Sequence, residues 1–273
     1  MNICVTGGAG FIGSHLVDRL IELGHDVLVI DNLSTGMRSF VHEDAQFIEM
    51  DVRDPKLLSV FEEFKPSIVF HEAAQTMVQS SMENPSYDCD VNLIGLINVL
   101  DACRKVNVEQ FLMPSSAAVY GDLAVLPLTE DLSGMPSSFY GLTKLTAEGY
   151  LRIYHEAFGL NTVCFRYANV YGPRQGDGGE GGVISIFNRL IVEGQPLTVF
   201  GDGEQTRDFI YVDDVVDANI KAMGNGQCTG IYNISTNKGT SVMKAERDFG
   251  FTATTTLEDG LQKTLEYFKA HHK

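Results

Sequence analysis

A tyrosine and a lysine four residues apart have the clearest potential for chemistry in this sequence. Tyr140 and Lys144 lie in a segment, residues 138–158, that we expect to form one helix. Side chains at this spacing project from one helix face, and an ammonium near a phenol favours the phenolate and lowers its pKa. Such a phenolate can take a proton from an alcohol. The alternative is an ordinary helix surface, since the same spacing also occurs by chance.

A hydroxyl group for the same reaction is expected at the end of a strand. Residues 110–113 predict a strand, and Pro114-Ser-Ser-Ala-Ala-Val-Tyr-Gly121 follows it with hydroxyls and small side chains. Ligands of open α/β sheets bind at the carboxyl ends of the strands. Ser116 could then hydrogen-bond the reacting oxygen while Tyr140 removes its proton. Together with a bound nicotinamide cofactor, these residues would carry out hydride transfer at a secondary alcohol.

The elements that would hold such a cofactor begin the chain. An apolar strand at residues 3–5 leads into Gly7, Gly10 and Gly13, and apolar residues recur at helical spacing from Phe11. Glycine permits a tight turn and lets backbone approach a phosphate, while the helix N-terminus offers free N–H groups to a pyrophosphate. The alternative is an empty α/β turn.

An acidic residue supports the cofactor interpretation and selects the cofactor. Asp31 follows the apolar run 27–30 and lies 24 residues after Gly7, about where a dinucleotide fold needs an acceptor for the ribose hydroxyls of adenosine. Its carboxylate would repel the 2′-phosphate of NADP, and the next basic residue is Arg38. We therefore predict NAD as the cofactor.

Composition sets the class of protein. The 273 residues are 44% hydrophobic and 21% charged, which suits one substantial core with a smaller appended lobe. The net charge of −16 disfavours nucleic acid or an anionic membrane as a partner, because both require clustered Lys and Arg. No apolar run approaches the ~20 residues of a membrane span, and Met1 leads directly into the first strand, so we expect a cytoplasmic protein. Five scattered cysteines and seven histidines predict reduced thiols and no metal site.

Three features together resemble one protein family. They are the G-x-x-G-x-x-G spacing from Gly7 to Gly13, the Tyr140 and Lys144 pair, and the run Tyr167-Ala-Asn-Val-Tyr-Gly-Pro-Arg174. They resemble the extended short-chain dehydrogenase/reductase family, in particular its nucleotide-sugar epimerases and dehydratases, over nearly the whole chain. The resemblance implies an α/β fold with a Rossmann-type doubly wound parallel sheet and a smaller C-terminal substrate lobe.

The resemblance also implies how the chain is divided and assembled. Residues 1–168 would form the NAD-binding domain, with 208–235 returning to it. Residues 169–207 and 236–273 would form the substrate lobe. Family members pair through the helices expected at residues 87–106 and 138–158, so we expect a homodimer.

Further cofactor residues are carried over from the family pattern. Asp51 would lie under the adenine ring, and Asn92 would hydrogen-bond backbone near the active site; a loop or cap carboxylate and a surface amide are the alternatives. Lys144 would also hold the nicotinamide ribose. The other cofactor residues implied are Phe11, Ile12, Asn32, Ser34, Thr35, Gly36, Val52, Ala73, Ala74, Gln75, Ser115, Tyr140, Tyr167 and Ala168.

The substrate implied by the resemblance is a UDP-sugar. Arg207 would bind its diphosphate with two parallel hydrogen bonds, and a surface ion pair with Asp208 is the alternative. The other substrate residues implied are Ser116, Ala117, Tyr140, Asn169, Gly182, Val183 and Gln205. The family continues for several dozen residues after the position of Val242, whereas this chain reaches Lys244 directly. Part of the nucleotide pocket is therefore deleted here or omitted from the given sequence.

The reaction implied is epimerisation at C4 of a glucose- or galactose-type UDP-sugar through a transient 4-keto intermediate. A 4,6-dehydratase or a decarboxylase begins with the same oxidation. The dehydratases carry an Asp-Glu pair, and the decarboxylases a Glu, where this chain has Ala117 and Ala118. Alanine cannot move the protons of an elimination. A non-catalytic NAD-binding sensor, the remaining alternative, would have no need of Ser116, Tyr140 and Lys144.

Overall fold

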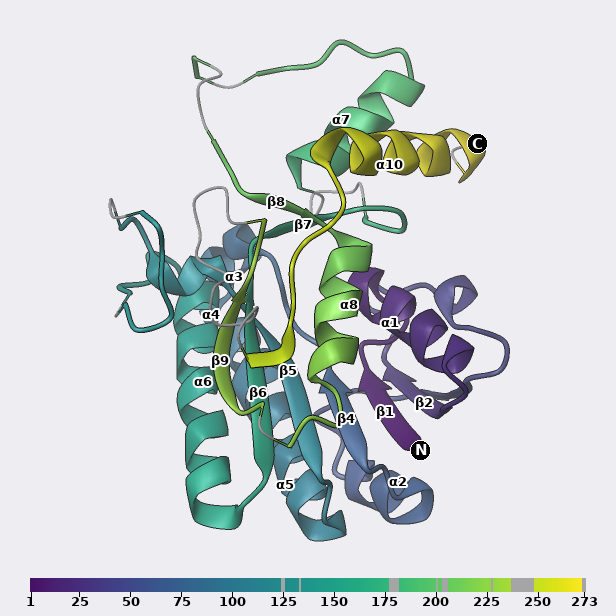
Figure 1. Cartoon of the computed structure of the whole chain (residues 1–273), viewed down its shortest axis with the longest axis vertical. Coiled ribbons are helices and arrows are strands. Elements are labelled where there is room, and N and C mark those ends of the chain that lie inside the picture. Colours follow the sequence, from purple (N-terminus) through teal and green to yellow (C-terminus); the bar gives the residue numbers. More distant parts are fainter. Residues whose placement is uncertain are drawn as a thin grey trace.

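A parallel β-sheet of seven strands lies at the centre of the molecule (Figure 1). The structure is a computed structural model that describes residues 1–123, 126–132, 134–176, 182–199, 201–202, 206–226, 228–236 and 248–271. Within these residues the strand order is β3-β2-β1-β4-β5-β6-β9. The strands are β1 (Asn2–Thr6), β2 (Asp26–Asp31), β3 (Gln46–Glu49), β4 (Ile68–His71), β5 (Gln110–Ser116), β6 (Asn161–Tyr167) and β9 (Gly230–Ile234).

The strand order reverses beside β1, and this reversal places the binding crevice. β1 pairs in parallel with β2 on one side and with β4 on the other. The connections on the two sides run in opposite directions, so the loops at the carboxyl ends diverge and leave room for a ligand. The predicted fold class is confirmed.

Helices cover both faces of the sheet, which explains why its strands are apolar throughout. Ile3 and Val5 of β1 pack into one hydrophobic cluster, whereas Cys4 between them packs into the other. Successive side chains of a strand point to opposite faces, so a strand covered on both sides has no polar face. The first cluster includes α1 (Phe11–Glu22) and α8 (Val212–Ala222), and the second includes α2 (Leu57–Phe64), α5 (Leu96–Val106) and α6 (Phe139–Phe158).

The helical segment predicted over residues 87–106 contains a wider turn. The short helices α3 (Val78–Glu83) and α4 (Pro85–Cys89) precede the π-helical turn η2 (Asp90–Gly95), which continues into α5. π turns are rare and occur mostly as single turns at functional sites. Asn92 lies in η2 and is buried. The turn therefore presents an amide side chain to the interior, where it needs polar partners.

A second group of elements stands over the carboxyl edge of the sheet (Figure 1). The short strands β7 (Asn169–Tyr171) and β8 (Phe209–Tyr211) pair in parallel. Above them α7 (Val183–Val192) packs against α10 (Leu257–His271). We call these four elements, together with residues 206–208 that lead into β8, the upper lobe. The predicted domain boundaries are tested by none of these contacts and stay a prediction.

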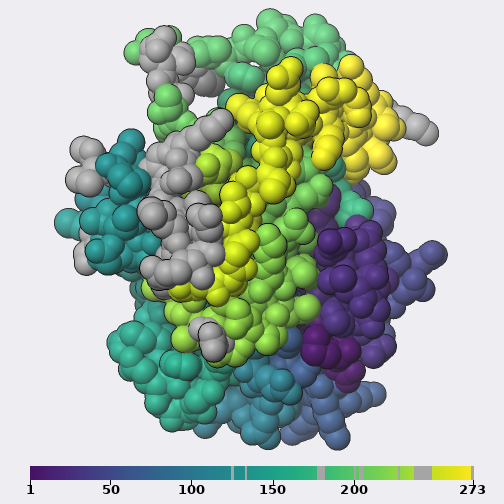
Figure 2. Space-filling view, in the orientation of Figure 1, coloured from purple at the N-terminus to yellow at the C-terminus, as the bar shows by residue number. Residues whose placement is uncertain are grey.

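Residues 248–256 lead to the upper lobe along α8 (Figure 2). Asp214 in the first turn of α8 accepts hydrogen bonds from the backbone N–H groups of Thr254 and Thr255, at 2.9 and 3.1 Å. These bonds fix the segment that leads into α10. The predicted departure between Val242 and Lys244 lies outside the described residues. None of the helices in the described ranges is both long and apolar enough to cross a membrane.

Candidate active site

A cavity of about 1490 Å³ lies between the carboxyl edge of the sheet and the upper lobe. Pockets for small ligands usually measure about 300–1,000 Å³. This cavity is therefore large enough for a long dinucleotide or for two ligands together. The residues that line it come from the ends of β1, β2, β4, β5 and β6 and from α6, α7 and α10.

The glycine-rich turn forms one wall of the cavity and has no space for side chains. Gly7 has a φ of +70°, and a Cβ on it would lie 2.5 Å from the backbone nitrogen of Ala73. A Cβ on Gly13 would lie 2.2 Å from the carbonyl oxygen of Gly7. No side chain caps the N-terminus of α1 at Gly10. Its free N–H groups can therefore bind an anion in the cavity.

Asp31 joins this turn to the end of β2. Its carboxylate accepts hydrogen bonds from the backbone N–H groups of Ala9, at 3.0 Å, and Leu33, at 2.8 Å. Asp31 lines the cavity although its side chain is largely buried. A carboxylate held in this way can accept the hydroxyls of a ribose.

Asp51 lines the same end of the cavity and is held by an arginine. Arg53 donates from Nε and Nη2 to both carboxylate oxygens of Asp51, each at 2.7 Å, and Asn32 donates at 2.8 Å. The Arg53 hydrogen bonds hold the pKa of Asp51 well below its usual range. Asp51 is thus a fixed anion at the same end of the cavity as Asp31.

The three predicted catalytic side chains converge where β5 ends and α6 begins. Ser138 caps α6 by accepting a hydrogen bond from the Gly141 N–H at 3.1 Å. Lys144 Nζ donates to the carbonyl oxygen of Pro114 at 2.9 Å and lies 5.9 Å from the ring centre of Tyr140. Ser116 hydrogen-bonds to Tyr140, and its Oγ also accepts the Ala118 N–H at 3.2 Å. The single hydroxyl proton of Ser116 is therefore directed to Tyr140, at the reacting end of the cavity.

The electrostatics of this group differ from the expectation that Lys144 would favour the phenolate. Burial raises the pKa of Tyr140 to about 12, a hydrogen bond from Ser116 opposes this rise, and the carboxylate of Asp88 adds to it. Burial also lowers the pKa of Lys144, against the attraction of nearby acidic groups. Without ligands, Tyr140 is therefore a neutral phenol at pH 7.

Most of the predicted binding residues line the cavity, with two exceptions among those described. Asn92 lies behind the wall: its Nδ2 donates to the carbonyl oxygen of Gln75, and its Oδ1 accepts the Gln75 N–H, both at 2.9 Å. Ala117 is the other exception, and Gln205 lies outside the described residues. Those that line the cavity are Gly7, Gly10, Phe11, Ile12, Gly13, Asp31, Asn32, Ser34, Thr35, Gly36, Asp51, Val52, Ala73, Ala74, Gln75, Ser115, Ser116, Tyr140, Lys144, Tyr167, Ala168, Asn169, Gly182, Val183 and Arg207.

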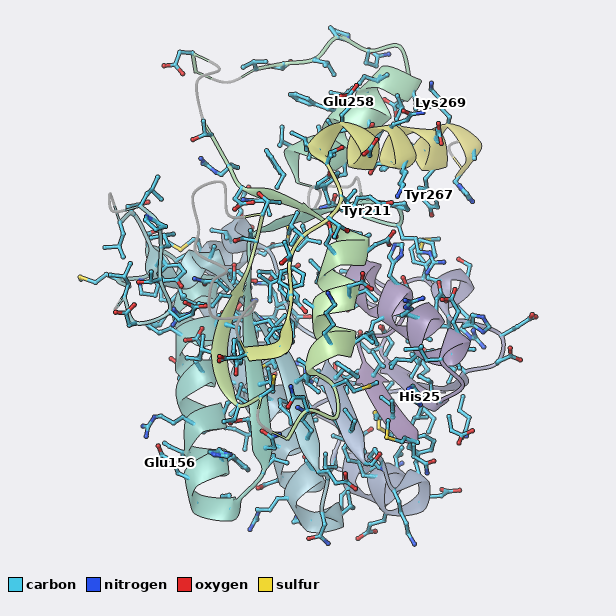
Figure 3. All side chains as sticks on the ribbon, viewed as in Figure 1. His25, Glu156, Tyr211, Glu258, Tyr267 and Lys269 are labelled. Carbon is cyan, nitrogen blue, oxygen red and sulfur yellow. The ribbon has the colours of Figure 1, made fainter. Side chains whose placement is uncertain are left out.

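The cavity also includes residues that the sequence analysis missed. Glu72 follows β4 directly and lines the cavity, and burial raises its pKa to about 7. The sequence could have indicated Glu72, because it directly precedes Ala73, a predicted cofactor residue at the end of a strand. Arg174 lines the cavity and pairs with Asp18 of α1 at 2.8 Å. Tyr267, on the side of α10 that faces α1 (Figure 3), carries no local signal because it lies far along the chain.

Comparisons with known proteins agree with this geometry. The sequence profile of the NAD dependent epimerase/dehydratase family matches residues 3–235. The chain is 40% identical over 247 residues to a UDP-glucose 4-epimerase of Mycolicibacterium smegmatis, covering 88% of this chain and 79% of that protein.

Two solved structures have the same fold along their whole length. A UDP-glucose 4-epimerase from Thermotoga maritima, crystallised with UDP-glucose, is 37% identical and superposes with a TM-score of 0.95, covering 100% of both chains. The Thermus thermophilus UDP-glucose 4-epimerase in complex with NAD is 34% identical, with a TM-score of 0.93 and coverage of 99% and 100%. The chain therefore belongs to the NAD dependent epimerase/dehydratase family.

Proposed function

We propose that this protein interconverts UDP-glucose and UDP-galactose by removing and returning hydride at C4 of the sugar. The observation that carries the proposal is one continuous cavity with the glycine-rich turn along one wall and Ser116, Tyr140 and Lys144 converging on another. The Mycolicibacterium smegmatis and Thermotoga maritima relatives, both named UDP-glucose 4-epimerase, support the same substrate.

The residues present fit NAD. The close approach of Gly7, Gly13 and Ala73 leaves a cradle that side chains would fill, and the free N-terminus of α1 suits a pyrophosphate. Asp31 suits two ribose hydroxyls and would repel the extra phosphate of NADP. When bound, NAD supplies the acceptor and donor of hydride.

The catalytic side chains would handle the proton of the same oxidation. Tyr140 takes the proton from the C4 hydroxyl as hydride leaves C4, and it returns that proton when the ketone is reduced from the other face. Ser116 donates a hydrogen bond to the reacting oxygen, since its own Oγ is oriented by the Ala118 N–H. Lys144, fixed on Pro114, provides a positive charge that favours the phenolate once the site is occupied.

Epimerisation is favoured over elimination because few acids face the reacting end of the cavity. Ala117 and Ala118 occupy the turn η3 (Ala117–Tyr120) directly after Ser116. Among the described residues of the cavity the carboxyl groups are Asp31, Asp51 and Glu72. The first two belong to the adenosine end of the proposed cofactor site, so only Glu72 could assist an elimination.

Product analysis tests the reaction directly. Incubation with UDP-galactose, followed by proton NMR, should yield UDP-glucose with no net release of NADH. A 4-keto-6-deoxy sugar would contradict the proposal and identify a dehydratase. In that case Glu72→Gln should abolish the elimination, whereas epimerisation should tolerate this substitution.

We further propose a homodimer that works in the cytoplasm. Apolar side chains are exposed along the outer surfaces of α4, η2 and α6, which a second copy would cover; they are Tyr87, Ile94, Leu142, Ile153 and Phe158. None of the five cysteines, all of them among the described residues, forms a disulfide bond, which suits a reducing compartment. Light scattering at micromolar concentration should give twice the mass of the chain, and a monomer mass would contradict the dimer.

A further inference from the structure

Asp88 is a buried carboxylate whose hydrogen-bond partners are all neutral. The hydroxyl of Thr143 donates to it at 2.8 Å, the side-chain amide of Gln75 at 2.7 Å and that of Asn92 at 3.1 Å. The side chain of Asp88 is completely inaccessible to solvent. In the described chain, no lysine or arginine forms an ion pair with it. An anion in such a place is costly, because burial without a cation forfeits its hydration.

The four residues of this network come from four segments around the reacting end of the cavity. Asp88 belongs to α4, Asn92 to η2, Thr143 to α6 and Gln75 to the loop after β4. The Thr143 hydroxyl also lies 3.0 Å from the carbonyl oxygen of Tyr140. Asp88 thus fixes the position of the α6 backbone at Tyr140 relative to Gln75 in the wall of the cavity.

The charge of Asp88 also acts on the phenol. It raises the pKa of Tyr140, whereas the Ser116 hydrogen bond lowers it. The ammonium of Lys144 lies on the ring of the same tyrosine, 5.9 Å from its centre. Tyr140 is therefore placed within the fields of a buried anion and a buried cation, and these fields have opposite effects on its basicity.

We propose that Asp88 is a positioning residue that keeps Tyr140 basic: its negative charge offsets the positive charge of Lys144 at the phenol. Without Asp88, the positive charges of Lys144 and of a bound oxidised nicotinamide ring would act on Tyr140 unopposed. The phenolate would then form at a lower pH and would accept the proton of the sugar hydroxyl less readily. In the step itself the C4–H bond breaks, hydride reduces the cofactor, and the hydroxyl proton passes to Tyr140. This inference rests on the proposed function.

Other titratable groups surround the pair and remain unchanged by the test. Burial lowers the pKa of Lys144, and the groups that oppose this are Cys164 in β6, Glu72 after β4, Glu148 on α6 and Asp88 itself. His71 at the end of β4 is buried, and its pKa is lowered to about 3, so it is neutral.

Asp88→Asn removes the charge and preserves the shape. The amide oxygen can accept the Gln75 and Asn92 donors, and the amide N–H can donate to the Thr143 hydroxyl. The Thr143 proton can then pass to a hydrogen bond with the Tyr140 carbonyl. Ultraviolet difference titration of the NAD-bound protein, against the matching Tyr140→Phe background, measures phenolate directly. We expect the phenolate of the variant to form at lower pH than in the parent. The acid limb of kcat should move the same way, and the rate at low pH should rise about tenfold for each unit of that movement.

A second charge removal provides the matched control. Asp101 on α5 accepts a hydrogen bond from the hydroxyl of Tyr154 at 2.9 Å. Like Asp88, it is a carboxylate close to a tyrosine of α6. Asp101→Asn should leave the titration of Tyr140 unchanged. An unshifted or higher titration of Tyr140 in a folded Asp88→Asn protein would overturn the inference. The spectrum reports phenolate whether or not the protein epimerises UDP-sugars, so this result is separable from a failure of the proposed function.

The parent protein provides a test that does not require the variant to fold. The inference needs Asp88 ionised where the enzyme works, although burial raises its pKa. Infrared spectra of protein labelled with carbon-13 at the aspartate carboxyl group should show no protonated aspartate at pH 8. A protonated aspartate band at that pH would overturn the inference.

Discussion

The two walls of the cavity are built in different ways. The wall at the sheet edge is fixed by buried polar contacts. Arg166 and Glu148 form a buried ion pair at 2.7 Å, and Glu148 also accepts a hydrogen bond from the hydroxyl of Ser115 at 2.6 Å. The wall in the upper lobe is more open. Arg207 is exposed, and within the described residues its guanidinium donates to the carbonyl oxygen of the neighbouring Thr206 at 2.8 Å.

The contrast separates chemistry from recognition. Proton and hydride transfer depend on atoms held to within a fraction of an ångström, which buried and mutually bonded side chains provide. A ligand that must enter, rotate in the site and leave needs a wall that can move. Segments with few buried contacts open at low free-energy cost. Substitutions at the sheet edge should therefore affect the reaction, and substitutions in the upper lobe should affect substrate affinity.

The largest effect is expected at the sheet edge with Tyr140→Phe. This change removes the proton acceptor and keeps the ring, so kcat should fall by about 10²–10⁴-fold, the usual contribution of a positioned acid or base. The fall should be in kcat and not in NAD affinity. Tyr150→Phe on the same helix is the control, since Tyr150 packs in the hydrophobic core away from the cavity. Full activity of Tyr140→Phe would refute the proposed mechanism.

The second effect tests whether the glycine-rich turn is as closed as its geometry indicates. A methyl group in Gly13→Ala would meet the Gly7 carbonyl oxygen at 2.2 Å, so turn and helix must separate. NAD affinity, measured by calorimetry, should fall by at least about 100-fold if roughly 3 kcal/mol of strain opposes the bound geometry.

Gly149→Ala on α6 is the matched control for this change. A Cβ there meets nothing within 4 Å, and alanine favours a helix over glycine by about 1 kcal/mol. Its NAD affinity should equal that of the parent. Equal NAD affinity in the two variants would show that the glycine-rich turn tolerates a side chain and is not the cofactor cradle.

The same contrast explains what could be predicted from the sequence. The sheet, the glycine turn and the convergence of Tyr140, Lys144 and Ser116 follow from short local patterns, because parallel strands bring their carboxyl ends to one edge. The raised pKa of Tyr140 did not follow, since it depends on burial and on Asp88, which lies on a different helix. The contribution of Tyr267 could not be foreseen either, because α10 reaches the cavity only through tertiary packing.

Arg207→Ala tests recognition by the upper lobe and should have a smaller effect. Loss of charge-assisted hydrogen bonds to a diphosphate, at about 1.5–3 kcal/mol, should weaken UDP-sugar binding by roughly 10–100-fold. Arg189→Ala, in the exposed pair with Glu193 on α7, should leave binding unchanged. If Arg207→Ala lowers kcat instead of affinity, the proposed separation between the two walls is wrong.

The smallest effect concerns Glu72, which follows β4 at the sheet edge and lines the cavity, where the charge of Lys144 only partly offsets the effect of burial. Burial raises its pKa from the usual 4.5 to about 7 in the folded protein, so the folded state holds its proton more tightly than the unfolded state. The carboxyl group thus begins to destabilise the fold as the pH rises above 4.5, and the destabilisation is complete above pH 7. Glu72→Gln removes this pH dependence.

The melting temperatures of ligand-free parent and Glu72→Gln proteins should therefore differ with pH. At pH 8 the variant should be the more stable, and at pH 5 most of its advantage should be lost because pH 5 is close to the unfolded-state pKa of 4.5. Burial lowers the pKa of the neighbouring His71 to about 3, so His71 destabilises the fold as the pH falls below 6.5. This destabilisation is the same in both proteins. The difference between them isolates Glu72. A difference that stays constant from pH 5 to pH 8 would show that Glu72 is solvated like the residues of the upper lobe, and the sheet edge would then be less closed than its buried contacts indicate.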